Sequence, residues 1–578
     1  MRYIFFIGIV ILTFCIADEK NEIVFKSVEI IGNKNIELEV VEDAIDVSRG
    51  SIFAFWKDKT PRINSRLIKT LPQTLKNFYD SEGYYDAEFM IGENNNSIRI
   101  LIDEKEPIKV ASIDITSDFD ISNFIFNKEN SVFRSKEFIE SKKQIIDKLL
   151  NDGYCSYDLD AKAYIDLEKH RADLVYNLKK GDICTFGETV IKGAEGIDNN
   201  VILSRVEALN GKRFNIQSVK DTYQRIEDLE AFDTVLVNAD RKIYNVVPID
   251  ITLKMLENPY YFSGGIGYDS FAGVRVGAQL VKRNFFSNAQ KLTLTGKYSM
   301  KDKVLDFDFF RPAILYYDGY YLDFGLNAGY SDVEYKGFGE EKEYIKGFMA
   351  YQFDRLLLKG GMGIENVNIY DLGTIDPDIT YGTYVLNYPF LQVIYDARDD
   401  RLNPKNGYYF AGYLEYGMPY NTNSSDYTKF EFEARGIYTY KEITFSTVGK
   451  IGTIEEISGY VPESKLFFGG GMFSNRAYGY NELGTIASPT EFLKSGALSM
   501  ANLSCEINFP IKNDIYGAVF TDNTMLSDTS YNFNGEIISS AGFGIRYITP
   551  VGPLKIDIGS NINDVSQFSI QFQLGQSF

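Results

Sequence analysis

The C-terminal segment Phe-Ser-Ile-Gln-Phe-Gln-Leu-Gly-Gln-Ser-Phe, residues 568–578, alternates apolar and polar side chains along most of its length. A period of two is typical of a β-strand, whose successive side chains point to opposite faces. The apolar face carries Phe568, Ile570, Phe572, Leu574 and Phe578, and the polar face carries Ser569, Gln571, Gln573, Gly575 and Ser577. The segment therefore predicts a strand with one apolar and one polar side.

The same alternation extends back through the chain to Pro259, and in many segments the polar face is charged. Lys429, Glu431, Glu433 and Arg435, for example, alternate with apolar residues. Burying such a face in a soluble protein would be very costly, whereas a transmembrane barrel with a wet lumen and an apolar exterior requires this pattern. We count about sixteen segments of about ten residues, the length that crosses a bilayer. Residues 259–578 are therefore predicted to form an all-β transmembrane barrel of about sixteen antiparallel strands. A soluble β-sandwich is the alternative, and the long acidic strands without a helical cover disfavour it.

The N-terminal half repeats one order of elements three times. A short β-run leads each repeat, a helical stripe follows, and each helix ends at a similar corner before two alternating strands. The corners are Glu82-Gly83-Tyr84, Asp152-Gly153-Tyr154 and Glu230-Ala231-Phe232, spaced by 70 and 78 residues. Repetition at this period indicates an array of modules. We predict three β-α-α-β-β modules, over residues 18–106, 107–182 and 183–258; a single larger α+β domain is the alternative. Pro72 within the first stripe predicts a break or a late helix start.

One glycine-dense stretch interrupts the barrel pattern. Residues 466–480 read Leu-Phe-Phe-Gly-Gly-Gly-Met-Phe-Ser-Asn-Arg-Ala-Tyr-Gly-Tyr and carry a single cation, Arg476. So many glycines are incompatible with a helix or strand interior. A barrel of this size has an aqueous interior unless something fills it. We expect the segment of about 452–496 to be that filling, the alternative being an ordinary surface loop.

Composition and the N-terminus limit the class of protein. The chain has 60 Lys and Arg against 80 Asp and Glu, a formal charge of −20, which gives no electrostatic basis for binding nucleic acid. Arg2, an apolar run and small residues before Asp18 predict a signal peptide over residues 1–17, with a lipoprotein reading at Cys15 as the alternative. No later apolar run approaches the ~20 residues of a membrane-spanning helix.

The sequence contains no recognisable enzyme motif. It lacks a phosphate loop, a Gly-x-Ser-x-Gly elbow and a Cys/His ligand set, and its only histidine is His170. We therefore predict no enzyme activity, no metal and no cofactor. The three cysteines after the signal, Cys155, Cys184 and Cys505, are odd in number and scattered over the chain, which is no disulfide scaffold. Cys155 and Cys184 could pair in an oxidising compartment, which the sequence alone does not decide.

Four motifs of the barrel half are specific: Asn475–Tyr480, Asp396–Asp399 with Asn403–Tyr409, Gly542–Tyr547 with Thr549–Leu554, and Phe568–Phe578. With the three modules they make essentially the whole mature chain resemble one family, the outer-membrane protein assembly factors of the BamA/TamA superfamily, whose modules are the POTRA (polypeptide-transport-associated) repeats. Two residues depart from the family pattern: Ala477 stands where a glycine is usual, and Gln576 where an apolar residue is usual. Three modules favour the TamA-like branch.

The resemblance also implies a site inside the barrel. Arg476, in a loop tip with Tyr478 and Gly479, is expected to pair with Glu506 and Asp522 on neighbouring strands of the inner wall. A guanidinium bonds carboxylates in a bidentate way, so these contacts would hold the loop in the lumen.

A barrel closes where its first strand pairs with its last, here Tyr260–Tyr268 with Phe568–Phe578. Glycines on both sides predict a weak seam that could serve as a lateral gate. The seam residues that we single out are Tyr260, Gly264, Gly265, Gly267, Phe568, Phe572, Gly575 and Phe578.

Together these features predict an insertase or translocation and assembly factor in the outer membrane of a Gram-negative bacterium, with its POTRA repeats in the periplasm. Its expected partners are unfolded outer-membrane or autotransporter-type proteins, the lipid bilayer and a TamB-like periplasm-spanning protein. Two alternatives stay open: a two-partner secretion transporter that exports one large exoprotein, and a passive porin with periplasmic appendages.

Overall fold

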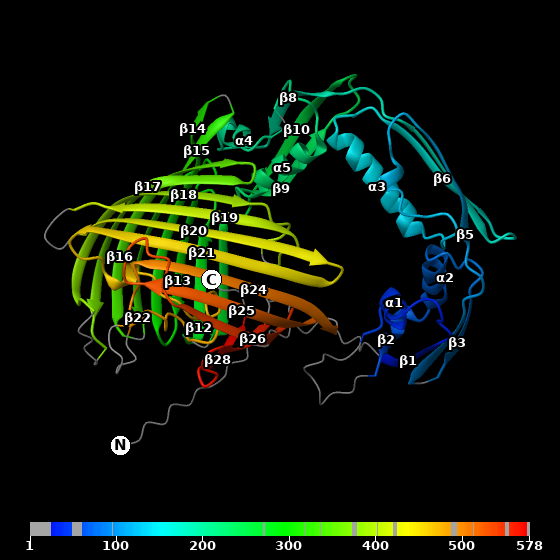
Figure 1. Cartoon of the computed structure of the whole chain (residues 1–578). Coiled ribbons are helices and arrows are strands. Elements are labelled where there is room, and N and C mark those ends of the chain that lie inside the picture. Colours follow the sequence, from blue (N-terminus) through cyan, green and yellow to red (C-terminus); the bar gives the residue numbers. More distant parts are fainter. Residues whose placement is uncertain are drawn as a thin grey trace, which may run out of the picture. The chain divides into compact units, whose positions relative to one another are not determined.

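The structure, a computed structural model, describes residues 25–48, 60–94, 96–207, 209–269, 272–317, 319–335, 337–372, 379–401, 403–419, 425–486, 494–512, 514–548 and 554–574. It comprises three α+β modules followed by a β-barrel (Figure 1). The predicted signal peptide, residues 1–17, lies outside the described residues. Among those that are described, no helix is both long and apolar enough to cross a bilayer.

Module 1 packs two helices on a four-stranded sheet of order β2-β1-β4-β3. Its elements are β1 (Phe25–Ile31), α1 (Leu38–Ala44), β2 (Arg62–Asn64), the 3₁₀ helix η1 (Ser65–Leu67), α2 (Leu71–Ser81), β3 (Glu88–Glu93) and β4 (Ser97–Asp103). Leu75 of α2 and Ile98 and Ile100 of β4 are fully buried in one core. Pro72 lies in the first turn of α2, so the predicted late helix start is confirmed.

Module 2 contains β5 (Lys109–Ser117), η2 (Ser122–Phe124), α3 (Ser135–Asn151), β6 (Asp158–Asp166) and β7 (Arg171–Lys179), in the sheet order β5-β7-β6. Its first helix is only the three-residue 3₁₀ turn η2, so the prediction of a full first helix in every module is wrong here. The aromatic and β-branched run Phe124-Ile125-Phe126 explains the difference, because such residues lose side-chain freedom in a helix.

Module 3 has the predicted order β-α-α-β-β. Its elements are β8 (Thr185–Lys192), α4 (Asn199–Leu203), α5 (Ile216–Glu227), β9 (Phe232–Ala239) and β10 (Val246–Met255), with the sheet order β8-β10-β9. The fold class predicted for the N-terminal half, an array of α+β repeats, is confirmed; the departures from the predicted order are the additional strand β2 in module 1 and the turn η2 in module 2.

The three predicted corners make the same backbone contact with the segment that follows. The carbonyl of Gly83 accepts from the N–H of Ile108 at 2.8 Å, and that of Gly153 from the N–H of Cys184 at 2.9 Å. At the third corner Ala231 accepts from Leu256 at 3.4 Å. Gly83 and Gly153 have φ of 93° and 86°, a backbone region that favours glycine. The corner is therefore a joint that recurs along the array.

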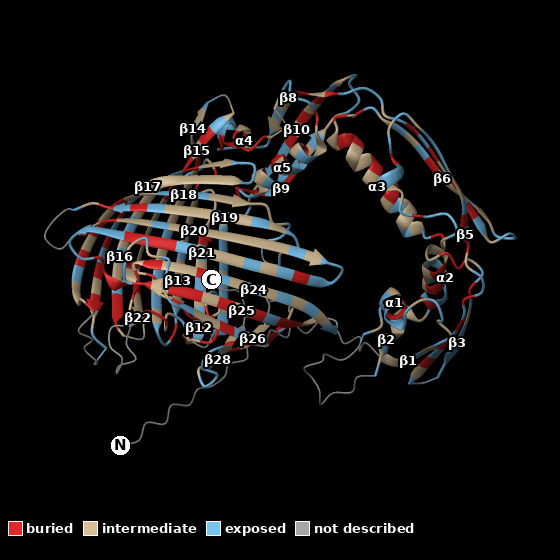
Figure 2. Cartoon of the chain, in the orientation of Figure 1, coloured by how far each residue is buried: buried red, intermediate tan, exposed pale blue. Residues whose placement is uncertain are grey.

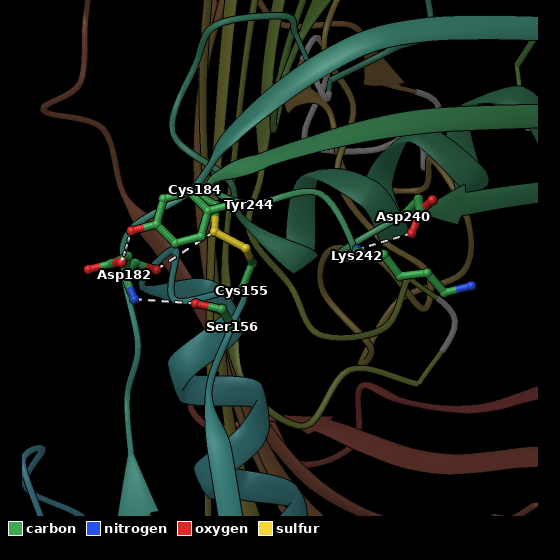
Figure 3. The surroundings of a disulfide bond; sticks show 7 residues. All are labelled: Cys155, Ser156, Asp182, Cys184, Asp240, Lys242 and Tyr244. Carbon is green, nitrogen blue, oxygen red and sulfur yellow. Dashed lines mark hydrogen bonds between the residues drawn. A yellow bond between two sulfur atoms is a disulfide. The ribbon is translucent and has the colours of Figure 1, made fainter.

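The second joint carries a disulfide between Cys155 and Cys184, which answers the question that the sequence left open (Figure 3). Cys184 and Ile108 occupy equivalent positions: Cys184 accepts from the N–H of Phe214, and Ile108 from that of Phe133, both at 2.8 Å. A covalent bond thus lies at the second joint where the first has a buried isoleucine.

Sixteen antiparallel strands form a closed barrel, as predicted (Figure 1). They are β11 (Tyr260–Asp269), β12 (Gly273–Lys282), β13 (Lys291–Tyr298), β14 (Asp302–Tyr317), β15 (Tyr320–Glu334), β16 (Gly339–Phe353), β17 (Leu356–Tyr370), β18 (Gly382–Asp396), β19 (Gly407–Gly417), β20 (Asp426–Tyr440), β21 (Ile443–Ser458), β24 (Ser499–Lys512), β25 (Ile515–Ser527), β26 (Ile537–Tyr547), β27 (Leu554–Asn561) and β28 (Phe568–Leu574).

The barrel is apolar outside, and its inner wall carries buried charged residues beside one apolar core. Exposed and less exposed residues alternate along its strands (Figure 2). Large apolar side chains such as Phe262, Leu391 and Phe543 are 71%, 49% and 60% exposed, whereas Glu365 and Asp522 are 2% and 0% exposed. An apolar exterior of this extent matches a lipid environment.

One long segment, residues 459–498, connects β21 to β24. It contains η3 (Glu463–Lys465), β22 (Thr485–Ile486) and β23 (Lys494–Ser495). Because β21 continues to Ser458, this segment begins seven residues later than the predicted residue 452. We call residues 459–498 the lumen loop.

Candidate functional site

The tip of the lumen loop is buried although it belongs to an irregular segment. Asn475 and Ala477 are 0% exposed and Arg476 is 5% exposed. The glycines make this compact course of the chain possible: Gly470 has a φ of 102°, and a Cβ there would lie 2.2 Å from the carbonyl oxygen of Gly479. The N–H of Gly471 donates to the carbonyl of Tyr478 at 3.0 Å, which closes the tip on itself.

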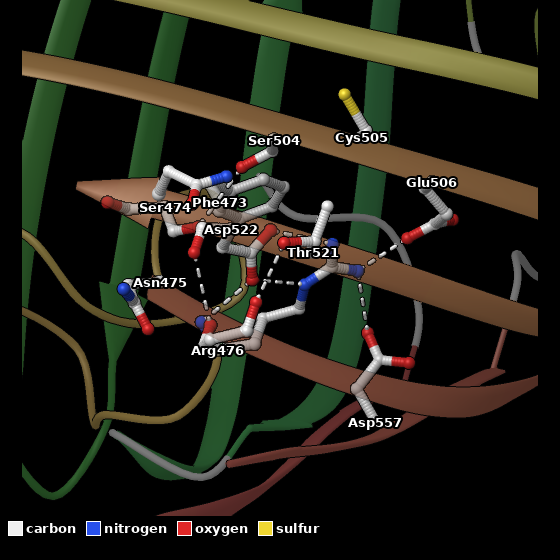
Figure 4. Close-up of polar contacts among 12 residues, drawn as sticks. Phe473, Ser474, Asn475, Arg476, Ser504, Cys505, Glu506, Thr521, Asp522 and Asp557 are labelled. Carbon is white, nitrogen blue, oxygen red and sulfur yellow. Dashed lines mark hydrogen bonds and ion pairs between the residues drawn. The ribbon is translucent and has the colours of Figure 1, made fainter. Parts of the chain in front are cut away.

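Arg476 is held by acidic side chains of the barrel wall (Figure 4). Its Nε and Nη2 donate to the two carboxylate oxygens of Asp522 on β25, each at 2.9 Å, and its backbone N–H donates to Oδ2 of the same residue at 3.0 Å. Nη1 bonds Glu506 on β24. The ring centroid of Phe520 lies 3.4 Å from the guanidinium carbon. Bidentate, charge-assisted bonds of this kind give both strength and geometric specificity.

Two further residues, Asp557 and Arg546, belong to the same charged cluster. Asp557 on β27 accepts from Nη1 of Arg476 at 3.4 Å and from Nη2 of Arg546 on β26 at 2.9 Å. Nη2 of Arg546 also donates to Glu506 at 3.2 Å. Arg476 and Arg546 therefore bond the three carboxylates directly, which allows these buried acids to remain ionised.

The loop tip is also bonded to the C-terminal end of the barrel. Nε2 of Gln571 on β28 donates to the carbonyl of Tyr478 at 2.9 Å, and Nδ2 of Asn561 on β27 donates to its hydroxyl at 2.7 Å. Nε2 of Gln567 donates to the carbonyl of Ala477 at 3.2 Å. Nδ2 of Asn475 in the tip donates to the carbonyl of Ile538 on β26 at 3.0 Å. The tip thus contacts each strand from β24 to β28, through Glu506, Asp522, Ile538, Asp557 and Gln571.

Ala477 fits the site in spite of its departure from the family pattern. The facing residue on β27 is Gly559, and a Cβ there would lie 2.7 Å from the backbone carbon of Arg476 and 3.0 Å from the nitrogen of Ala477. The glycine that permits close approach at this contact is therefore on the wall. Gly479, also predicted in the tip, donates its N–H to Glu482 at 2.9 Å.

The barrel closes at a seam where its first strand, β11, pairs with its last strand, β28. Among the described residues these strands share only two register pairs, Tyr268 with Leu574 and Asp269 with Gln573, whereas β11 and β12 share ten. The rings of Tyr268 and Phe572 meet with centroids 5.4 Å apart. Tyr260 and Phe568 are the first residues of their strands, and Gly264, Gly265 and Gly267 lie in the middle of β11. Gly575 and Phe578 lie outside the described residues.

The structure thus brings Arg476, Glu506 and Asp522 together, while Arg546, Asp557 and Gln571 join them without having been selected from the sequence. Their signal was present in part: Lys555 and Asp557 share the polar face of their alternating strand, as do Gln571 and Gln573. The alternation assigns a residue to the inner wall but does not say which loop residue it meets there.

This fold and site define a class of proteins: sixteen-stranded membrane barrels with N-terminal α+β repeats and a loop bonded inside the lumen. Residues 284–578 match the Omp85 superfamily domain. Residues 23–105 and 106–181 match the POTRA family, described as a surface antigen variable number repeat. The chain belongs to the Omp85 superfamily.

Known relatives agree with this assignment. The chain is 22% identical over 614 residues to the outer membrane protein assembly factor BamA of Nitratidesulfovibrio vulgaris, covering 97% of this chain and 74% of the relative. It is 20% identical to BamA of Neisseria meningitidis serogroup B, covering 97% and 79%. The crystal structure of BamA from Haemophilus ducreyi lacking POTRA domains 1–3 has the same fold, with a TM-score of 0.54 and 17% identity, covering 81% of this chain and all of that one. The predicted location, in the outer membrane with POTRA repeats in the periplasm, is confirmed.

Proposed function

We propose that this chain is an assembly factor that helps β-barrel or autotransporter-type proteins to insert into the outer membrane, through a lateral gate between β11 and β28. The observation that carries the proposal is the seam: among the residues that the structure describes, β11 has two register pairs with β28 and ten with β12. The two BamA relatives, which carry the name of outer membrane protein assembly factors, support it.

The physical reason is the cost of an unpaired strand edge in lipid. A client strand entering the bilayer cannot leave its amides and carbonyls unpaired, because no water is there to bond them. A seam that opens can offer the edges of its own two strands as a template. The client then exchanges pairing partners, so no covalent step and no cofactor are needed.

Clients in this proposal are unfolded outer-membrane proteins, and the lipid bilayer is the medium into which they pass. The edge strands of the module sheets, such as β6 and β9, offer sites where an extended segment can add as a further strand. A TamB-like periplasm-spanning protein is the partner that we propose on the basis of the three-module array. A passive porin is not favoured, because apolar residues of the lumen loop and the wall form a packed core within the barrel.

The gate can be tested with a reversible cross-link. Tyr268→Cys and Leu574→Cys are register partners across the seam, and Cys505→Ser removes the free thiol. Liposomes with the reduced variant should fold an unfolded barrel client faster than empty liposomes. After oxidation this acceleration should be lost and should return on reduction.

A matched cross-link serves as the control. Leu280→Cys and Leu294→Cys are register partners on β12 and β13, away from the seam. Oxidation of this pair should leave the acceleration unchanged. Client folding that stays equally fast with the seam cross-linked would contradict a lateral gate between β11 and β28.

A further inference from the structure

A second buried charge lies near the start of the lumen loop, where the loop leaves β21. Lys465, the last residue of η3, is 8% exposed, and its Nζ lies 2.9 Å from Glu415 on β19 and 3.1 Å from Glu365 on β17. Both glutamates are 2% exposed. The ring centroid of Tyr388 on β18 lies 4.2 Å from the ammonium. Neither the gate nor the Arg476 cluster uses this group.

The surroundings of Lys465 are built to keep it charged. Tyr388 donates its hydroxyl to Glu365, and Tyr413 and Tyr427 donate theirs to Glu415. Burial acts to lower the pKa of the Lys465 ammonium, but Glu365 and Glu415 outweigh it and hold this pKa above its usual value. Lys346 also bonds Glu365 at 3.0 Å, so two ammonium groups oppose two carboxylates.

The backbone around Lys465 is fixed as well. Its carbonyl accepts from Nζ of Lys429 on β20 at 2.8 Å. Phe467 forms a two-bond bridge with Ala497 at the other end of the loop, with N···O distances of 2.9 and 2.8 Å. Both residues are part of the apolar core that includes Val367 and Tyr427 of the wall. We call residues 461–467 and 495–498 the loop root.

We propose that Lys465 is a second anchor of the lumen loop, which holds the loop root on β17 and β19 independently of the attachment of the tip by Arg476. The two anchors bond different parts of the wall: the seventh and ninth strands of the barrel at the root, and the twelfth to the sixteenth at the tip. The loop therefore connects these two parts of the wall. Release of the tip leaves the loop root attached, and release of the loop root leaves the tip attached. The inference concerns attachment of the loop and does not depend on client insertion.

The test uses full-length protein in planar bilayers and proteoliposomes. Ser474→Cys, in a Cys505→Ser background, reports exposure of the tip to a membrane-impermeant maleimide; single-channel conductance reports whether the loop still fills the lumen. Arg476→Ala should speed labelling about tenfold or more, since loss of one partner of a buried ion pair shifts an equilibrium at least that far. Conductance should stay near that of the parent protein, because the root remains attached.

Adding Lys465→Met to Arg476→Ala should raise the conductance at least about fivefold, because a barrel of this size is water-filled when nothing occupies it. Lys465→Arg in the same background should keep the conductance low. The matched control is Lys342→Met, which removes an inner-wall ammonium that lies 3.1 Å from the buried Glu340 of the same strand. This control substitution should not raise the conductance. Heat-modifiable migration on gels verifies the barrel in each variant.

A last variant separates anchoring from charge balance. Lys465→Met with Glu415→Gln keeps the net charge of the cluster; combined with Arg476→Ala it should still give the raised conductance, because the bond is absent. A return to the low conductance of Arg476→Ala alone would mean that Lys465 only neutralises the glutamates, and would overturn the proposal. So would full conductance from Arg476→Ala alone, or no added effect of Lys465→Met.

Discussion

In module 1, strand β4 buries Ile98, Ile100 and Ile102 beneath a helix, whereas barrel strand β25 buries Asp522 and Thr524 on its inner face. Both strands alternate with a period of two. In the module the apolar face is the inner one, and in the barrel the apolar face is the outer one. The alternation therefore identifies two faces, and only the surroundings decide which of them is buried.

The comparison also separates two kinds of stabilisation. The module core is held by apolar area removed from water, which does not depend on the orientation of each contact. The tip of the lumen loop is held mainly by ion pairs and hydrogen bonds, whose groups are costly as soon as one partner is missing. The loss of stability caused by a substitution should therefore have a different physical origin in each region. In the lumen it should also depend more strongly on which neighbouring residues remain.

The largest effect is expected in the lumen. Asp522→Asn removes the carboxylate that accepts three hydrogen bonds from Arg476 and leaves that guanidinium short of charge balance. We expect a loss of about 3–5 kcal/mol in the free energy of unfolding of the barrel, measured by urea titration in lipid vesicles with a gel-mobility readout. The control is Asp528→Asn, an exposed aspartate just beyond the same strand, which should stay within about 0.5 kcal/mol. Similar losses for both would contradict the charge-balance argument.

The matching change in a module is Leu75→Ala, at a residue with 0% exposure in the core of module 1. We expect a loss of about 2–5 kcal/mol, from the lost apolar contact and the cavity. Hydrogen exchange of the β4 amides measures it as a local unfolding free energy. Leu101→Ala, on the other face of β4 and 37% exposed, should change this value by about 0.5 kcal/mol or less.

The second joint adds a third kind of stabilisation, because a disulfide between Cys155 and Cys184 lies where the first joint has a buried isoleucine. The cysteines are 29 residues apart in the chain. The double substitution Cys155→Ser with Cys184→Ser should therefore lower the free energy of unfolding by about 2–4 kcal/mol. Faster hydrogen exchange at residues 151–156 and 182–186 would report it, and a reductant should have the same effect on the parent protein. Cys505→Ser, at the free cysteine, should leave exchange there unchanged. Equal exchange with and without the disulfide would show that the joint is held by its backbone bonds alone.

The smallest effect is expected for an ion pair on a module surface. Arg99 and Glu29 lie 2.7 Å apart, but their side chains are 63% and 55% exposed. Arg99→Ala should therefore cost less than about 1 kcal/mol, and less still at high salt. The same hydrogen-exchange measurement on module 1 checks this value. A loss as large as that of Asp522→Asn would show that burial is not what separates the two pairs.

Most of the fold could be predicted from the sequence, because it depends on local periods. The corners at Gly83 and Gly153 and the alternating strands carry their signal within a few residues each. The first helix of module 2 was predicted wrongly because the repeat was extended to a segment whose aromatic run disfavours helix. The lumen loop begins later than predicted because the alternating charge pattern is lost near residue 452 while the strand continues to Ser458.

Less of the candidate site could be predicted from the sequence. The contacts of Arg476 with Glu506 and Asp522 were expected only through the resemblance to a family, since they join residues 30 and 46 positions apart. Asp557 lies two strands from Asp522, and its approach depends on barrel register, which the sequence pattern does not give. Lys465 had no signal at all: Glu463-Ser464-Lys465 looks like an exposed polar turn, and an irregular segment has no period to reveal its burial.

The bonding of the lumen loop also sets an order of events for the barrel's own folding. The partners of Lys465 precede the loop in the chain, whereas those of Arg476 follow it, on strands between Ser499 and Asn561. The root can therefore be seated once β17 to β19 are in place. The tip has no complete set of acceptors until β24, β25 and β27 have joined the wall. Seating of the tip is thus a late step, and a seated tip indicates that the C-terminal part of the wall is complete.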